Sequence, residues 1–298
     1  MLMKIPNRVL QSYPGRDGES GQALIIIVLA LPVLLGMLAL ALDGGYAFAQ
    51  RRRMQNAADA AALAGARQLA LEMGDEAIDE AVRDIAVANG AELVTWSYSG
   101  DGQGITVTAE CTFETFIAGA IGVSTMTARA TAQGHIDYLG RTGALLPMII
   151  REQEFIPGVT YDLWNNVQEF PGNFGWLDWN GVPVSNAELA SNIANPSQSG
   201  LWSVGDWVPA GPGVKNSGPV RNALSLWVGR NITIPFYDRY RGMGAQGAYH
   251  ISGFGEFVLT GYNFRGSNKR VSGYFIRWVE AGPGGGSDHG IRTVYLAE

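Results

Sequence analysis

Residues 23–42 read ALIIIVLALPVLLGMLALAL, twenty consecutive residues without a charged or strongly polar side chain. A helix rises about 1.5 Å per residue, so this run covers about 30 Å, the thickness of the hydrocarbon core of a bilayer. Pro32 and Gly36 lie inside the run, and membrane helices tolerate such residues better than soluble helices do. The run predicts one transmembrane helix.

A cleaved signal peptide and a buried core helix are the alternatives to a membrane anchor. The apolar run is about twice as long as the apolar region of a signal peptide. Arg51, Arg52 and Arg53 follow it as a stop-transfer flank would, and a core helix normally carries a polar face that this run lacks. We therefore expect an uncleaved anchor preceded by a tail, residues 1–22. Three basic residues precede the run and three follow it closely, so charge does not assign its orientation.

The next segment, residues 50–71, consists almost entirely of strong helix formers. Met54, Ala58, Ala61 and Gly65 recur at three- and four-residue spacing and form a stripe of small side chains. Such a stripe allows close approach, either by the chain's own domain or by a partner helix. Asp43 stands where the apolar run ends. We expect it to be solvated at the membrane interface, with pairing to a basic residue of a partner helix as the alternative.

Together these features resemble the N-terminal module of TadE/TadG-like Flp (tight adherence) pilus-assembly proteins. The resemblance covers about residues 18–70 and is carried by the apolar helix, Asp43-x-Gly45 and the run QNAADAAALAGA at residues 55–66. It implies a single-pass, minor-pilin-like component of a pilus or secretion assembly. It also implies an extracytoplasmic C-terminal part and partners among other pilin-like or Tad assembly subunits. The chain lacks the D-x-S-x-S run of a metal-dependent adhesion domain, so no metal site is carried over.

Charge and cysteine content exclude some functions. Residues 73–298 hold fourteen Lys and Arg against twenty-two Asp and Glu, a net charge of −8, which disfavours nucleic acid as a partner. Cys111 is the only cysteine, so neither an intramolecular disulfide nor a thiolate metal cluster is possible. We expect Cys111 to be buried in a strand.

Residues 73–140 predict a small α+β module. Apolar residues recur with helical periodicity from Asp75 to Asn89, and Asn89-Gly90 ends that helix. Alternating patterns predict strands over residues 92–98, 105–112 and 126–136, and residues 113–121 suggest a short helix. A helix on one face of this sheet would make the module a rigid base.

Residues 141–298 predict a mainly β domain rich in tryptophan and glycine. Seven of the eight tryptophans lie here, and short apolar runs alternate with turn signals. The expected strands are residues 145–150, 204–208, 231–237, 248–254, 257–262, 271–279 and 291–297. One helix is expected from Ser217 as its cap, with Pro219 in its first turn.

Catalytic, cofactor and metal motifs are lacking. A Ser252, His250 and Asp238 set could be imagined as a membrane-anchored hydrolase, but no G-x-S-x-G turn presents the serine. Residues 170–180 form an aromatic, glycine-rich cluster containing Trp176 and Trp179. Exposed, this cluster could bind a surface glycan or protein ligand and make the chain an adhesin; buried, it is a loop folded on the β core. We expect no enzyme activity and no cofactor.

Overall fold

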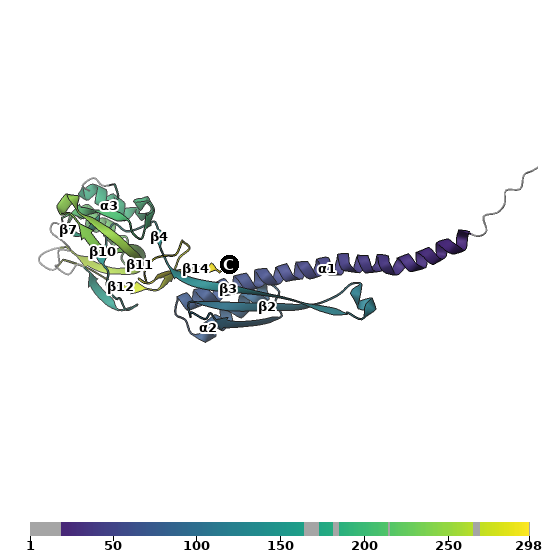
Figure 1. The fold of residues 1–298 in the computed structure, drawn as a ribbon. Helices are drawn as coiled ribbons and strands as arrows, with labels where there is room; N and C mark the ends of the chain where they lie inside the picture. The colour runs from purple at the N-terminus through teal and green to yellow at the C-terminus, as the bar shows by residue number, and fades with distance from the viewer. Residues whose placement is uncertain (1–18, 164–172, 181–184, 214, 265–268, 298) are drawn as a thin grey trace, which may run out of the picture. The chain divides into compact units, whose positions relative to one another are not determined.

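The computed structural model describes residues 19–163, 173–180, 185–213, 215–264 and 269–297, with the side chains of residues 19–22 and 121 left out. The fold is α+β: one long apolar helix, a short helix, and then mostly β structure, as predicted (Figure 1). Contacts divide the chain into two compact units. One comprises the chain up to Arg52 together with residues 111–128, and the other comprises residues 53–110 and 129–298.

Helix α1 spans Glu19–Ala70, so the predicted transmembrane helix and the alanine-rich helix form one continuous element. Pro32 lies inside it without ending it, and Gly44 and Gly45 are helical as well. The polar residues after Leu42 therefore change the chemistry of the helix surface and leave the backbone helical.

Helix α2 spans Asp75–Ala88, close to the predicted bounds. Within the described residues, a five-stranded sheet follows in the order β1-β2-β3-β14-β13. Its strands are β1 Leu93–Tyr98, β2 Gly104–Glu114, β3 Thr125–Tyr138, β14 Ile291–Leu296 and β13 Trp278–Val279. β1 is antiparallel to β2 and β14 is antiparallel to β3, so β13 and β14 complete a sheet that begins with Leu93.

One face of this sheet is apolar and the other is polar, because side chains alternate along each strand. In β2 the buried residues Ile105, Val107 and Ala109 alternate with threonines and a glutamate. Thr108 bonds Thr131 of β3 on the polar face, at 2.9 Å. The second half of α1 packs on the apolar face: Ile105 lies against Gly65, and Gly134 of β3 lies against the backbone of Ala62.

Strands between Arg141 and Ile276 form a second β assembly. In the described part of the chain, a seven-stranded sheet has the path β5-β10-β11-β12-β6, with β9 pairing both β11 and β7. The strands are β5 Ile150–Arg151, β6 Thr160–Leu163, β7 Asn173–Leu177, β9 Trp207–Pro212, β10 Asn231–Arg241, β11 Ala248–Asn263 and β12 Arg270–Ile276. The short strands β4 Arg141–Thr142 and β8 Trp202–Ser203 pair separately.

Two apolar clusters fill this assembly. One includes Met148, Phe236 and Phe257 together with residues of helices α3, Asn186–Ala194, and α4, Gly218–Ser225. The other includes Tyr237, Tyr249 and Phe254. Residues 234–237 of β10 and 251–259 of β11 are all buried, although successive side chains of a strand point to opposite faces. Both faces of the central strands are therefore covered.

Several local predictions are confirmed and others are wrong. Ser217 caps α4 by accepting a hydrogen bond from the backbone N–H of Val220, as expected. The strands predicted over 248–254 and 257–262 are one strand, β11, because Gly255 and Glu256 remain extended between them. The helix predicted over 113–121 is wrong: β2 continues to Glu114, and only η1, Ala118–Ile121, forms a short 3-10 turn.

Candidate functional site

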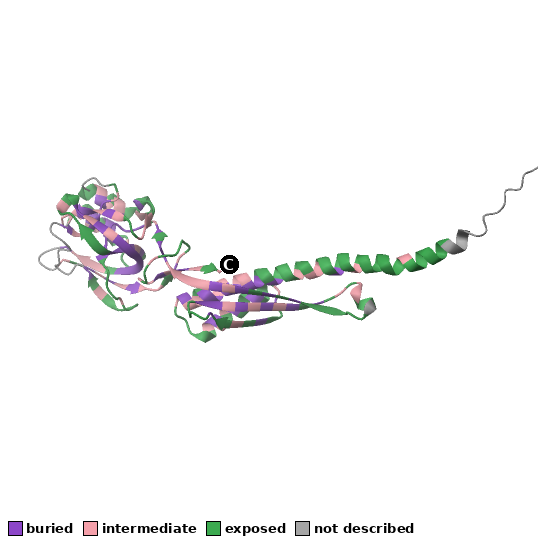
Figure 2. Ribbon diagram, in the orientation of Figure 1, coloured by how far each residue is buried: buried purple, intermediate pink, exposed green. Residues whose placement is uncertain are grey.

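The first half of α1 is an exposed apolar cylinder. Every residue from Ala23 to Leu42 is exposed except Ala30 and Ala39, which are half-exposed, and Figure 2 shows this stretch of the helix as exposed. Among the described residues this is the one helix long and apolar enough to cross a membrane. The buried-core-helix alternative is wrong, because a core helix would be covered by the rest of the chain.

Asp43 is the first residue after this apolar run, and it is only 4 % exposed. Its carboxylate accepts backbone hydrogen bonds from Phe116 at 2.6 Å, Ile117 at 3.0 Å and Ala118 at 2.7 Å. The expectation of a solvated Asp43 is therefore wrong. An ionised carboxylate only accepts hydrogen bonds, and three N–H donors at the turn between β2 and β3 meet that requirement without a basic partner.

Aromatic contacts strengthen the attachment of this turn to α1. Tyr46, one turn after Asp43, meets the ring of Phe113 edge-on at 5.2 Å and that of Phe116 at 5.3 Å. Cys111 is buried, as predicted, with its Sγ 3.7 Å from the side-chain oxygen of Gln50. Asp43 and Tyr46 thus hold the end of the β2–β3 hairpin against one face of the helix.

The stripe of small residues lies in the protein core. Met54, Ala58 and Ala61 are fully buried, and Gly65 is buried as well. A Cβ atom on Gly65 would lie 2.7 Å from Cγ2 of Val82 in α2 and would also collide with Ile105. The chain's own helix and sheet occupy this stripe, which is the first of the two arrangements considered for it.

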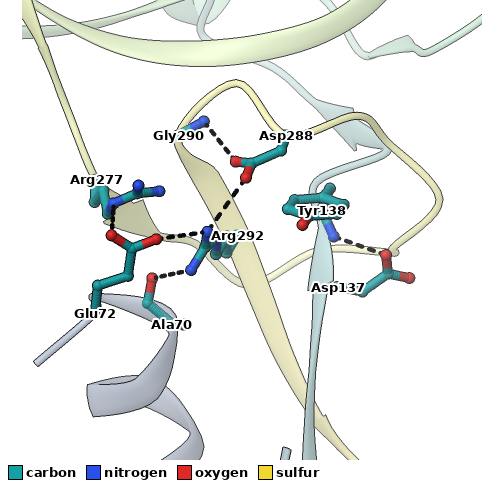
Figure 3. Close-up of polar contacts among 8 residues, drawn as sticks. All are labelled: Ala70, Glu72, Asp137, Tyr138, Arg277, Asp288, Gly290 and Arg292. Carbon is teal, nitrogen blue, oxygen red and sulfur yellow. Dashed lines mark hydrogen bonds and ion pairs between the residues drawn. The ribbon is translucent and has the colours of Figure 1, made fainter. Parts of the chain in front are cut away.

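The end of α1 is fixed by two arginines from the C-terminal segment (Figure 3). Arg292 donates to the carbonyl oxygen of Ala70 at 3.1 Å and to the carboxylate of Glu72 at 3.1 Å. Arg277 contacts the same Glu72 carboxylate at 2.7 Å, and Asp288 lies 3.3 Å from Arg292. Because the last carbonyls of a helix have no partner within it, Arg292 acts as a cap supplied from 222 residues away.

The aromatic cluster does not present a tryptophan pair. Trp176 is 1 % exposed and packs in the core against Phe264, with ring centroids 5.9 Å apart. Trp179 is half-buried and packs on Trp202 at 5.6 Å. Residues 170–172 of this cluster lie outside the described residues. A ligand patch that needs both Trp176 and Trp179 at the surface is therefore inconsistent with this structure, and the buried interpretation holds for Trp176.

The imagined nucleophilic set is only partly assembled. Nδ1 of His250 lies 2.6 Å from Asp238, so the histidine has an acidic partner. Its Nε2 is 2.9 Å from Arg239, however, and the hydroxyl of Ser252 is buried without a hydrogen-bond partner. A serine activated by His250 would need a hydrogen bond to the imidazole, and the arginine stands at that nitrogen instead.

The described residues also contain surface cavities with titratable groups. A cavity of about 470 Å³ is lined by residues that include Trp227, Thr233 and Glu256. Glu256 is buried and accepts a hydrogen bond from Thr233 at 3.0 Å, and burial raises its pKa to about 7. A second cavity of about 380 Å³ includes His289, whose pKa is lowered by burial. No group of three or more His, Cys, Asp or Glu side chains is arranged for a metal ion in the described part of the chain.

Sequence reasoning missed the partner of Asp43. The available signal was an aspartate at the end of an apolar run, which fitted a solvated carboxylate as well as a paired one and did not indicate the backbone donors. The donors lie 73 to 75 residues away in a turn whose only sequence signature is its lack of charge.

Comparison with known proteins identifies the N-terminal part of the chain. No curated protein and no solved structure matches the chain. The match to a family model covers residues 21–68, which include the apolar run, Asp43 and the small-residue stripe. The resemblance seen in the sequence is thus confirmed for this segment: residues 21–68 match the family described as Putative Flp pilus-assembly TadE/G-like.

Proposed function

We propose that this protein is a membrane-anchored, minor-pilin-like structural component of a Flp/Tad-type pilus or secretion assembly. One observation carries the proposal. The segment that matches the pilus-assembly family lies in a single helix whose first half is exposed and apolar and whose second half buries one face in a folded module. The matched family is one of assembly proteins, so this chain would act by holding and positioning rather than by catalysis.

The continuity of α1 also supports an anchor that is retained. Residues 54–70 of the helix fill the core of the module, and the apolar run precedes them without a break. Removal of the run as a signal peptide would cut within a continuous helix. The folded module would then be carried directly on the membrane helix.

The proposed orientation places residues 53–298 on the extracytoplasmic side of the membrane. The family resemblance supports this orientation. The basic residues flanking the run do not contribute, because their numbers are balanced on the two sides. Contacts with other subunits would use surface that the fold leaves free, such as the exposed Phe48 just beyond the membrane. The stripe from Met54 to Gly65 is not free for this purpose.

Reporter fusions test the orientation. An alkaline phosphatase domain, active only outside the cytoplasm, is joined after Glu298, and a green fluorescent protein, which fluoresces when folded in the cytoplasm, is joined at the same point. We expect an active phosphatase and a dark fluorescent protein. The reverse result would overturn the proposed orientation.

Site-specific photo-crosslinking tests the assembly role. A photoreactive amino acid at Phe48 should form adducts with pilin-like subunits in cells that assemble the pilus. The same group at Ala61, which is fully buried, is the matched control and should form only adducts within the chain. Equal inter-subunit crosslinking at both positions, or none at Phe48, would contradict the proposal.

A further inference from the structure

The turn between β2 and β3 is unusual in composition. Residues 115–127, which we call the hairpin tip, read TFIAGAIGVSTMT, and no charged residue lies between Glu114 and Arg129. Soluble hairpins normally place polar and charged residues at their ends, where water surrounds the chain. The hairpin tip instead consists of apolar, glycine and hydroxyl residues.

Large apolar side chains of the hairpin tip are exposed. Phe116 is 68 % exposed, Val123 47 % and Met126 38 %. Closer to the module the same hairpin behaves differently, since Cys111 and Phe113 are buried. The apolar surface of the hairpin thus opens outward only at its tip.

The position of the hairpin tip along α1 is set by Asp43. The backbone N–H groups of residues 116–118 bond directly to this carboxylate, which follows Leu42, the last residue of the apolar run. If residues 23–42 cross the hydrocarbon core, the hairpin tip lies at the level where that core ends. Tyr46 lies at the same level, and tyrosine is enriched at the interface between membrane and water.

We propose that the hairpin tip is a second membrane contact, seated in the boundary between the lipid headgroups and the acyl chains. Its exposed apolar side chains continue the lipid-facing surface of residues 23–42, and its lack of charge suits that depth. The carboxylate of Asp43 can lie at this depth because three backbone N–H groups satisfy its need for hydrogen-bond donors. The proposal rests on the membrane anchoring in the proposed function. Two points of contact would restrict rotation of the helix about its own axis.

Depth measurements in vesicles test the proposal on the full chain. Cys111→Ala removes the native thiol, and a single cysteine carrying an environment-sensitive fluorophore is placed at Leu34 in the span, Val123 in the hairpin tip or Leu93 in β1. Leu93 is the matched control, because it is an exposed apolar residue of the folded module. The protein is reconstituted in phosphatidylethanolamine and phosphatidylglycerol vesicles at a low protein-to-lipid ratio.

We expect lipids with a nitroxide near the headgroup to quench the Val123 label severalfold more than the Leu93 label. Aqueous iodide should quench in the opposite order. Asp43→Ala should raise iodide quenching at Val123 and leave Leu34 unchanged, because only the attachment of the hairpin tip is lost. Circular dichroism confirms that each labelled protein is folded.

The Leu34 label distinguishes a failure of the membrane anchor from a failure of the hairpin-tip contact. If it is not quenched by lipid nitroxides, the anchor itself fails and the proposed function with it. If Leu34 lies in lipid while Val123 is as open to iodide as Leu93, the hairpin tip is in water and the inference is overturned. It is also overturned if Val123 is shielded from both quenchers, because a second protein chain would then cover the tip.

Discussion

The two halves of α1 are both rich in apolar residues, but one half is exposed and the other buries a face in the protein core. Residues 23–42 are mostly large aliphatic side chains, and nearly all of them are exposed. Nearly half of residues 54–70 are alanine, and their inward stripe is buried. Apolar character alone therefore does not indicate which residues form a protein core. Within α1 the size of the side chains separates the two halves, because small residues allow a sheet to approach the helix, while large residues without nearby partners suit lipid.

The largest expected effect comes from the same substitution in the two halves. Met54 is fully buried, whereas Met37 is 65 % exposed. Met54→Ala should lower the free energy of unfolding of the module by about 2–5 kcal/mol, since the methionine leaves a cavity in a packed core. Met37→Ala should change it by less than about 0.5 kcal/mol.

Hydrogen exchange of the β2 amides, measured on the full chain in detergent micelles, gives this free energy for each variant. A similar loss for both methionines would break the comparison, because it would mean that residues 23–42 also pack on protein. Protection of the amides of residues 44–50 reports separately on the integrity of the helix.

A second test adds volume instead of removing it. Val favours strands, yet at Gly134 of β3 its Cβ would collide with the carbonyl oxygen of Ala62 and lie 3.0 Å from Cβ of Ala66. Gly134→Val should cost about 1–3 kcal/mol, since a helix backbone cannot move aside as a flexible side chain can.

Gly261→Val in β11 is the matched control, because nothing lies within 4 Å of a Cβ at that position. It should leave stability unchanged or slightly raised in urea unfolding followed by circular dichroism. Equal effects at the two glycines would show that close approach between α1 and β3 is not what Gly134 provides.

These contrasts also show which parts of the fold the sequence could predict. The span, α2 and the strands of the module follow from local periodicity, and Ser217 predicted the start of α4 from a local cap. Contacts between distant residues carry no local pattern. The Asp43 bonds to the hairpin tip and the Arg292 cap on Ala70 are of this kind. The choice between a buried and an exposed aromatic cluster is of the same kind, because whether Trp176 is covered depends on its packing against the distant Phe264.

A third test extends the comparison to the β assembly, which buries a carboxyl group with less support than Asp43 receives. Burial raises the pKa of Glu256 to about 7, and the hydrogen bond from Thr233 only partly opposes this. The unfolded chain therefore releases this proton near pH 4.5, whereas the folded protein holds it until about pH 7. Stability from this group is fully present below pH 4.5 and falls by about 1.4 kcal/mol per pH unit between the two values.

Glu256→Gln should remove that part of the slope, while Glu80→Gln at an exposed site should not. Burial lowers the pKa of His289, which destabilises the fold as pH falls below its ordinary value near 6.5. The two slopes oppose each other, so the difference between wild type and Glu256→Gln isolates the carboxyl group. Urea midpoints at several pH values measure it, and parallel curves would rule out a buried proton at Glu256.

The smallest expected effect lies on the outer face of α2. Nε of Arg83 lies 2.7 Å from the Asp79 carboxylate, but the two side chains are 57 % and 42 % exposed. Arg83→Ala should cost no more than about 0.5 kcal/mol and should cost less at high salt, because water and ions screen an exposed pair. Val82→Ala, one residue earlier, removes a fully buried side chain beside Gly65 and should cost several times more. Thermal unfolding of both variants at low and high salt compares the two faces of one helix. A larger loss for Arg83 than for Val82 would mean that α2 is held by charge rather than by its packing on the buried half of α1.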